Sequence, residues 1–358
     1  MKKCLATKLT GRTNNSSLLR LGELIIGIHS VSNPSKASQV FSVAFSKETK
    51  LEIIGDGYFT DETLTSNKGK TLTVKNETNI FFSNGNYNIS IADKYSVVSL
   101  SFSGKNIANT YLERSNKYLN IESLKYSKGL TILNCSAESV SGNISSLENL
   151  TLLINLNFTL SKVSGDIDAL KNLTALTYLN LSQSNVSGNI DALKNLTALT
   201  SFDFSNTLVS GDIDAFKNLT ALTSFNIFNT NTPIIGSINS LSGLSKLLNA
   251  QIKYAQLSGD LAVLPTSFRF VSFLGDAGST FTWGTRPSSA KIIAIEGNVS
   301  LTNIDKMLQD QAQCQIGFTS SDTVAYKTIS VAGNRTSASD DAVTTLQQKG
   351  YTISIAKA

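Results

Sequence analysis

The sequence contains little of what enzymes and metal sites are built from. Its 358 residues include one histidine, His29, and three cysteines, Cys4, Cys135 and Cys314. Three widely separated cysteines match neither a disulfide framework nor a thiolate metal site. A site with several imidazole ligands is excluded, and a nucleophile would have to use a histidine from the apolar stretch LIIGIHSV. We therefore predict that the protein is not an enzyme and binds no cofactor and no metal ion.

Charge and long apolar runs are also scarce. Only 16% of residues are charged, with 31 Lys and Arg against 26 Asp and Glu, and an excess this thin does not predict nucleic-acid binding. Lys8 interrupts the apolar run that begins at Cys4, well short of the ~7 to 15 residues of a signal-peptide core. No run reaches the ~18 apolar residues of a membrane span. We expect a soluble chain with no export signal and no membrane insertion.

An internal repeat fills the middle of the chain. Three similar blocks, each starting with Val-Ser-Gly, follow one another at 163–185, 186–208 and 209–231. The repeated glycines, with successive spacings of 23, 23, 23, 25 and 23, are Gly142, Gly165, Gly188, Gly211, Gly236 and Gly259. A weaker unit precedes these blocks at 121–135, and a partial one follows at 261–273. Such a period is typical of stacked repeat proteins.

The apolar residues within one block are spaced by three and finally by two, at Ile167, Leu170, Leu173, Leu176, Leu179 and Leu181. This spacing fits neither an α-helix nor a long strand. It predicts a coil that turns side chains inward every few residues and ends in a short strand at Leu179 and Leu181. Equivalent strands of successive coils would stack in parallel around one shared core.

The run LTALTYLNLSQSNVSGNI resembles the leucine-rich repeat, in the LxxLxLS…VSGxI form best known from plant receptors. The resemblance covers about 140 to 155 residues and implies an α/β-type solenoid with parallel strands, whose concave side binds partners. Where the family has a ladder asparagine, this chain has Ser184, Thr207 and Thr230. Their hydroxyls would link neighbouring backbones with one donor fewer, so we expect a looser ladder.

The strand register predicts three columns of side chains on the concave face. Small amides and hydroxyls dominate them, which suits recognition of sugars or polar proteins, and two aromatic side chains offer anchors. The alternative is an inert solvated face, because strand positions facing water are polar in any case. The candidate ligand-binding residues are Asn155, Asn157, Tyr178, Asn180, Ser201, Asp203, Ser224, Asn226, Phe228, Gln251 and Lys253. Phe228 and Lys253 belong to the third column, which also includes Ser182 and Ser205.

Acidic residues recur before the short convex turns, with Asp166 and Asp168 in one coil and Asp212 and Asp214 in another. Calcium needs six or more oxygen ligands, and each turn offers only two carboxylates. We favour capping of the turns, with Asp168, Asp191 and Asp214 as the capping residues.

The two ends of the chain differ from the repeats. Residues 1–105 carry short β-type runs separated by turns, typical of a small antiparallel sandwich that covers the open end of the solenoid. Residues 276–358 contain two strand–helix units, IAIEGN and ISVAGN with the helices that follow, and a last strand, YTISIA. These read as a terminal cap. The predicted domains are 1–105, 106–275 and 276–358.

Within the cap, one helix is expected to place four residues on one face that packs inward. These are Ile304, Met307, Leu308 and Ala312. Ser339 is expected to cap a second helix that buries Ala342, Val343 and Leu346 and stops at Gly350. The single tryptophan, Trp283, is interpreted as a core anchor at the junction, with a binding spot as the alternative.

The opening MKKCLATKLTGRTNNSSLLRLGEL resembles the start of proteins from tailed bacteriophages and prophages of gut Bacteroidales, including crAss-like phages. The resemblance covers about the first 25 residues. It implies a virion structural protein, a head decoration, fibre or tail-associated protein. Its N-terminal region would contact other virion proteins, and its repeats would meet a host surface protein or glycan. Because attached fibres are often trimers, a homotrimer is expected by analogy. The alternative is a bacterial leucine-rich repeat adhesin or scaffold, at the cell surface or in the cytoplasm.

Overall fold

The computed structural model describes two compact units, Met1–Gly165 and Asp166–Ala358. The described residues are nine strands within 24–103 and the segments 119–136, 140–228, 230, 234–253, 255–273, 279–318 and 327–356. The N-terminal stretch 1–23, with Cys4, and His29 lie outside them. Among the described residues, no helix combines the length and the apolar character that crossing a membrane requires.

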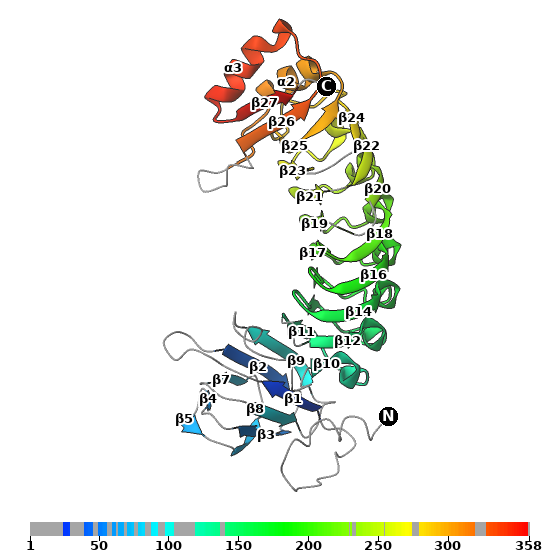
Figure 1. The fold of residues 1–358 in the computed structure, drawn as a ribbon. Coiled ribbons are helices and arrows are strands. Elements are labelled where there is room, and N and C mark those ends of the chain that lie inside the picture. Colours follow the sequence, from blue (N-terminus) through cyan, green and yellow to red (C-terminus); the bar gives the residue numbers. More distant parts are fainter. Residues whose placement is uncertain are drawn as a thin grey trace. The chain divides into compact units, whose positions relative to one another are not determined.

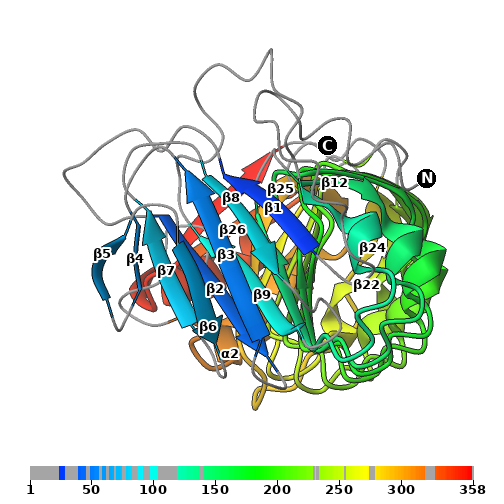
Figure 2. The ribbon, with the colours of Figure 1, turned by 90° about the horizontal axis from the view of Figure 1, so that it is seen from below.

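The N-terminal region forms two antiparallel sheets that lie as two layers (Figures 1 and 2). One has the order β1-β8-β3-β6, and in the other β5, β4, β7, β2 and β9 pair in turn. The sandwich-like arrangement predicted for this region is confirmed. The strands are β1 (Leu24–Ile28), β2 (Gln39–Phe45), β3 (Thr49–Gly55), β4 (Phe59–Asp61), β5 (Leu64–Asn67), β6 (Lys70–Val74), β7 (Thr78–Phe82), β8 (Tyr87–Ile91) and β9 (Val97–Ser103).

Strand β9 joins this sandwich to the first repeat. One edge of β9 pairs antiparallel with β2, and the other pairs parallel with β11 (Ile132–Cys135), with Leu100 opposite Leu133. The antiparallel sheet therefore passes directly into the parallel strands of the solenoid. Because an open strand edge invites uncontrolled pairing, this junction provides the expected cover for the first coil.

Each coil has an inner strand, a second strand and a 3₁₀ turn, and both sets of strands stack in parallel. The first unit contains inner strands β11 and β13 (Asn155–Asn157), second strands β10 (Leu119–Asn120), β12 (Val140–Asn143) and β14 (Lys162–Asp166), and turns η2 (Ile121–Leu124) and η3 (Ile144–Leu147). In the second unit the inner strands are β15 (Tyr178–Asn180), β17 (Ser201–Asp203), β19 (Ser224–Phe228), β21 (Asn249–Lys253) and β23 (Phe270–Ser272).

The second strands of that unit are β16 (Asn185–Asn189), β18 (Leu208–Asp212), β20 (Ile234–Ser237), β22 (Gln256–Asp260) and β24 (Thr280–Thr282). Its 3₁₀ turns are η4 (Ile167–Leu170), η5 (Ile190–Leu193), η6 (Ile213–Phe216), η7 (Ile238–Leu241) and η8 (Leu261–Val263). In Figure 1 the inner strands β17 to β23 and the second strands β16 to β22 form two separate rows. This is the predicted leucine-rich repeat fold.

The core is the column of apolar residues that the spacing predicted. Ile167, Leu170, Leu173, Leu176, Leu179 and Leu181 all have 0% exposure. Phenylalanines replace leucines in the next coils, where the Phe202 and Phe225 rings stack with centroids 5.3 Å apart, and Phe216 lies against both. No single coil has a second layer to cover these side chains, so burial depends on the neighbouring coil.

The repeated glycine holds neighbouring coils together. In η4, the carboxylate of Asp166, not that of Asp168, accepts the amide of the residue two ahead, and Asn189 and Asp212 do the same in the next turns. The expected capping residues were therefore wrong by two positions. Gly188 has φ +113° and lies over Asp166, and Gly211 has φ +131° and lies over Asn189, where a Cβ would overlap the capping oxygen.

We predict that Gly211→Ala lowers the free energy of unfolding by about 1–3 kcal/mol, because it forces alanine into a left-handed conformation and against Asn189. Gly243→Ala is the matched control, since Gly243 is exposed and has no atom within 4 Å of the added Cβ. Urea unfolding of both variants tests this, and equal stabilities would contradict it.

The C-terminal cap continues both sheets through one long strand, β25 (Ala294–Leu301). Its first residues pair with β23 and its last with β24, and Gly297, at φ +121°, lies between the two parts. β26 (Thr328–Ala332) and β27 (Thr352–Ala356) follow in parallel, with helices α2 (Ile304–Gln313) and α3 (Asp340–Gln348) between the strands. The predicted strand–helix cap is confirmed (Figure 1).

Helix α2 buries Ile304, Met307 and Leu308 as expected, but its fourth buried residue is Gln311 and not Ala312, which is half-buried. The Gln311 amide accepts from the Ile293 N–H at 2.6 Å and donates to the Ile293 carbonyl at 3.1 Å. The side chain thus replaces a strand partner for a buried backbone segment.

A buried arginine and the tryptophan tie the last coil to the cap. Arg286 is 3% exposed and donates to five backbone carbonyls at 2.9–3.3 Å. Burial lowers its pKa to about 10, so it remains charged at neutral pH. Trp283 is 1% exposed and donates to Asp310 at 3.1 Å, which confirms the core anchor and removes the alternative of a binding spot.

In α3, Ala342 and Leu346 are buried, whereas Val343 is only half-buried. Gly350 has φ +90° and ends the helix as expected. Ser339 precedes α3 but does not cap it with its side chain, because its hydroxyl donates to Asp305 of α2 at 2.6 Å. Thr336 also donates to Asp305, through its amide at 3.1 Å and its hydroxyl at 2.6 Å.

These donors hold the pKa of Asp305 below its ordinary value. A lowered carboxyl pKa stabilises the fold above the ordinary value and loses that contribution as the pH falls through the folded pKa. We predict that Asp305→Asn has a lower thermal midpoint at neutral pH, and that the difference from wild type shrinks below about pH 4. Thermal unfolding followed by circular dichroism checks this, and a difference independent of pH would contradict it.

Candidate binding surface

The inner strands of the second unit place the predicted columns as the sequence indicated. Tyr178, Ser201, Ser224 and Asn249 stand opposite one another in the first column. The second column comprises Asn180, Asp203, Asn226 and Gln251. All eight are half-buried. Phe228, half-buried, and Lys253 pair in the third column. In the first unit, Asn155 and Asn157 occupy the equivalent places on β13, opposite Ile132 and Asn134 of β11.

The surface ends at β23, a limit that the sequence did not indicate. All three residues of this strand are buried, and the columns continue there with Phe270 at 2% and Ser272 at 0% exposure. Ser272 donates to Glu296 of the cap strand at 2.7 Å. In the second unit, the accessible part of the face therefore lies on β15 to β21.

Second-column side chains fold toward the turn that follows each strand. Asn180 Oδ1 accepts from the amide of Ser182 at 3.0 Å and from its hydroxyl at 2.7 Å, and Asn157 holds Thr159 in the same way. Asp203 Oδ1 accepts the Ser205 amide at 2.9 Å. Ser182 and Ser205 are 6% and 2% exposed. Placing them on the accessible face was wrong, because these turns draw them into the coil.

Hydroxyl side chains form a different ladder from the expected one. Ser184 and Thr207 each donate at 2.6 Å to a carbonyl three residues earlier in their own coil, Leu181 and Phe204. Coils are instead joined by backbone bonds through the turns, such as Gln183 N–H to the Ser205 carbonyl at 2.8 Å. At the start of the strands, Thr200 and Thr223 donate through amide and hydroxyl to the previous threonine's carbonyl, at 2.8–2.9 Å.

The concave side chains also contact one another. Ser201 and Ser224 hydroxyls lie 3.2 Å apart, Asn226 Nδ2 donates to Asp203 Oδ2 at 3.2 Å, and Asn180 Nδ2 donates to the Tyr178 hydroxyl at 3.3 Å. The Oδ1 atoms of Asn155 and Asn249 are buried without a protein donor. A buried carbonyl of this kind is satisfied by water or by a ligand N–H.

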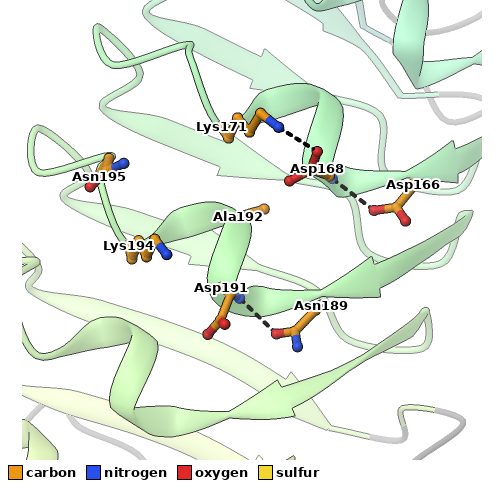
Figure 3. Close-up of a pocket in the computed structure, with 8 residues that line it drawn as sticks. All are labelled: Asp166, Asp168, Lys171, Asn189, Asp191, Ala192, Lys194 and Asn195. Atoms are coloured by element: carbon orange, nitrogen blue, oxygen red, sulfur yellow. Dashed lines mark hydrogen bonds and ion pairs between the residues drawn. The ribbon is translucent and has the colours of Figure 1, made fainter.

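A polar pocket of about 450 Å³ lies between η4 and η5 (Figure 3). Asp168 forms an ion pair with Lys171 at 2.8 Å, and this pairing raises the pKa of Lys171. Asp166 and Asn189 each use one side-chain oxygen to cap a 3₁₀ turn. Across the described segments there is no group of three acidic, histidine or cysteine side chains that would hold a metal ion. The residues lining the pocket are Asp166, Asp168, Lys171, Asn189, Asp191, Ala192, Lys194 and Asn195.

The described cysteines do not provide a nucleophile. Cys135 and Cys314 are both buried and form no disulfide. Burial raises the pKa of each thiol, and a neutral buried thiol is unreactive.

Comparisons with known proteins give fold neighbours at low identity. No protein-family model and no curated protein matches the chain. Internalin C2 from Listeria monocytogenes is 22% identical over 48% of this chain and 77% of its own, with a TM-score of 0.35. The PEPR1–AtPEP1 structure is 18% identical over 73% of this chain and 35% of its own, with a TM-score of 0.48. A third neighbour is the leucine-rich repeat ectodomain of the Arabidopsis receptor kinase HAESA in complex with an IDA peptide hormone. It is 23% identical over 57% of this chain and 34% of its own, with a TM-score of 0.43.

The chain thus spans 35% of the PEPR1–AtPEP1 chain and 34% of the HAESA chain. Its own geometry identifies the fold: parallel inner strands, 3₁₀ turns and a shared leucine column form a leucine-rich repeat solenoid.

Proposed function

We propose that this chain is a non-enzymatic binding module whose concave strands β15 to β21 hold a partner protein or another polar surface molecule. The observation that carries the proposal is where the three near-identical coils differ. They differ at only two of their first fifteen positions but at all eight of their last, in the blocks 163–185, 186–208 and 209–231. The last eight positions comprise the concave strand with its outward and its buried side chains, the turn after it and the first residue of the second strand.

Exposure alone does not explain this distribution. Asp168, Lys171, Asn172 and Thr174 on the convex side are exposed, yet both following coils repeat them unchanged. Exposed substitutions usually change stability little, so folding would have tolerated differences there. The changes at the two outward strand positions, which are Tyr178 and Asn180 in the first block, are expected where the concave face distinguishes ligands.

The chemistry of the face also supports binding. Apart from Lys253 and the two aromatic residues, the face consists of half-buried amides, hydroxyls and one carboxylate, several of them held by neighbours in defined positions. Pre-ordered polar groups lose little entropy on association. Tyr178 and Phe228 add large apolar contacts of the kind that dominate binding energy.

We predict that Tyr178→Ala and Phe228→Ala each weaken binding at least tenfold, because each removes an aromatic anchor worth about 2 kcal/mol or more. The measurement is binding of the full chain to arrays of bacterial surface proteins and glycans. Asn195→Ala, on the exposed convex side, is the control and should bind like wild type. Unchanged binding by both concave variants would remove this surface from the proposal.

We further propose that the protein is a component of a phage particle, with its N-terminal region against other virion proteins. Support comes from the resemblance of about the first 25 residues to proteins of Bacteroidales tailed phages, in a segment outside the described residues. The alternative placement is a bacterial adhesin or scaffold.

Mass spectrometry of purified particles tests the placement, because a structural component is present in every virion. We expect peptides from 119–358 at a stoichiometry comparable to other structural proteins. Absence from virions, together with recovery in a bacterial membrane or cytoplasmic fraction, would favour the bacterial alternative.

A further inference from the structure

The carboxylate of Asp203 carries a charge that the fold does not need. Its Oδ1 accepts the Ser205 amide at 2.9 Å, and Asn180 and Asn157 make the same bond with a neutral amide one and two coils earlier in the sequence. An asparagine would therefore serve the turn equally well. Charged groups away from bulk water are costly unless compensated, and Asp203 is half-buried.

Nothing positive compensates this charge in the strands around it. Asp203 accepts from Asn226 Nδ2 at 3.2 Å, and β15, β17 and β19 contain no lysine, arginine or histidine. None of the ion pairs among the described residues includes Asp203. A carboxylate has about four acceptor positions, so it retains capacity for further donors.

Two aromatic side chains lie diagonally on either side of Asp203. Register places Tyr178 one strand before and Phe228 one strand after it, each two residues along. With strands ~4.8 Å apart and a rise of ~3.3 Å per residue, both Cα atoms are roughly 8 Å away. The Tyr178 hydroxyl lies 3.3 Å from Asn180 Nδ2, so its ring leans toward the column that contains Asp203. Aromatic faces attract cations within about 6 Å.

We propose that this carboxylate and its flanking aromatic rings receive an arginine side chain of the partner protein. The inference rests on the proposed binding function and specifies the chemistry of the partner. The carboxylate supplies charge and paired acceptors that suit a guanidinium, and the rings cover the apolar stem.

The experiment uses the full chain as wild type, as Asp203→Asn and as Asp191→Asn. Asp203→Asn removes the charge and keeps the turn, as Asn180 shows. Asp191→Asn removes the same charge from an exposed convex turn and is the matched control. The probe is an array of immobilised peptides, each containing one arginine and also present with neutral citrulline in its place.

We expect wild type to bind a subset of the arginine peptides and to lose at least tenfold in affinity with citrulline. Asp203→Asn should lose affinity for the arginine peptides by a similar factor and should bind the arginine and citrulline forms equally. Asp191→Asn should match wild type. Equal affinity of Asp203→Asn and wild type, equal binding of both peptide forms, or no peptide binding by wild type would each overturn the inference. If Tyr178→Ala and Phe228→Ala lose binding to surface proteins or glycans while Asp203→Asn does not, the proposed function stands and only this inference fails.

Discussion

The interaction on which the structure depends is the packing of each coil's apolar column against the coils beside it. A coil of 23 residues has one row of leucines and no second layer, so its core exists only in a stack. The stack must then be closed at both ends. Here the antiparallel sandwich covers the first coil of the first unit through β9, and the strand–helix units cover the last coil of the second unit through β25.

In this stacking the two halves of a coil have different structural roles. The half with the glycine, the capping side chain and the 3₁₀ turn fixes the spacing of coils, since Gly188 and Gly211 seat the capping oxygens of their neighbours. The half with the strand and its turn needs only its inward side chains for the core. Its outward side chains are therefore available for recognition, and they differ among the three blocks, as several of its buried side chains do.

Polar groups on the concave face serve folding and recognition together. Asn157, Asn180 and Asp203 each fasten the turn after their strand through one oxygen. The remaining amide or carboxylate atoms are then fixed in place before any partner arrives. Asp203 makes the same bond to the turn amide as the other two and adds a negative charge, which gives one coil a chemical identity.

The sequence by itself determined the repeat, its buried residues and the order of the concave columns. Inward and outward positions in a short strand depend on local alternation, so Leu179 and Tyr178 could be assigned from spacing alone. Only the tertiary structure decided which oxygens cap the turns, that Ser182 and Ser205 are buried, that Gln311 binds the backbone of Ile293 and that β23 is covered. Each of these depends on side-chain direction or on contacts between distant segments, and neither is encoded in the period of a repeat.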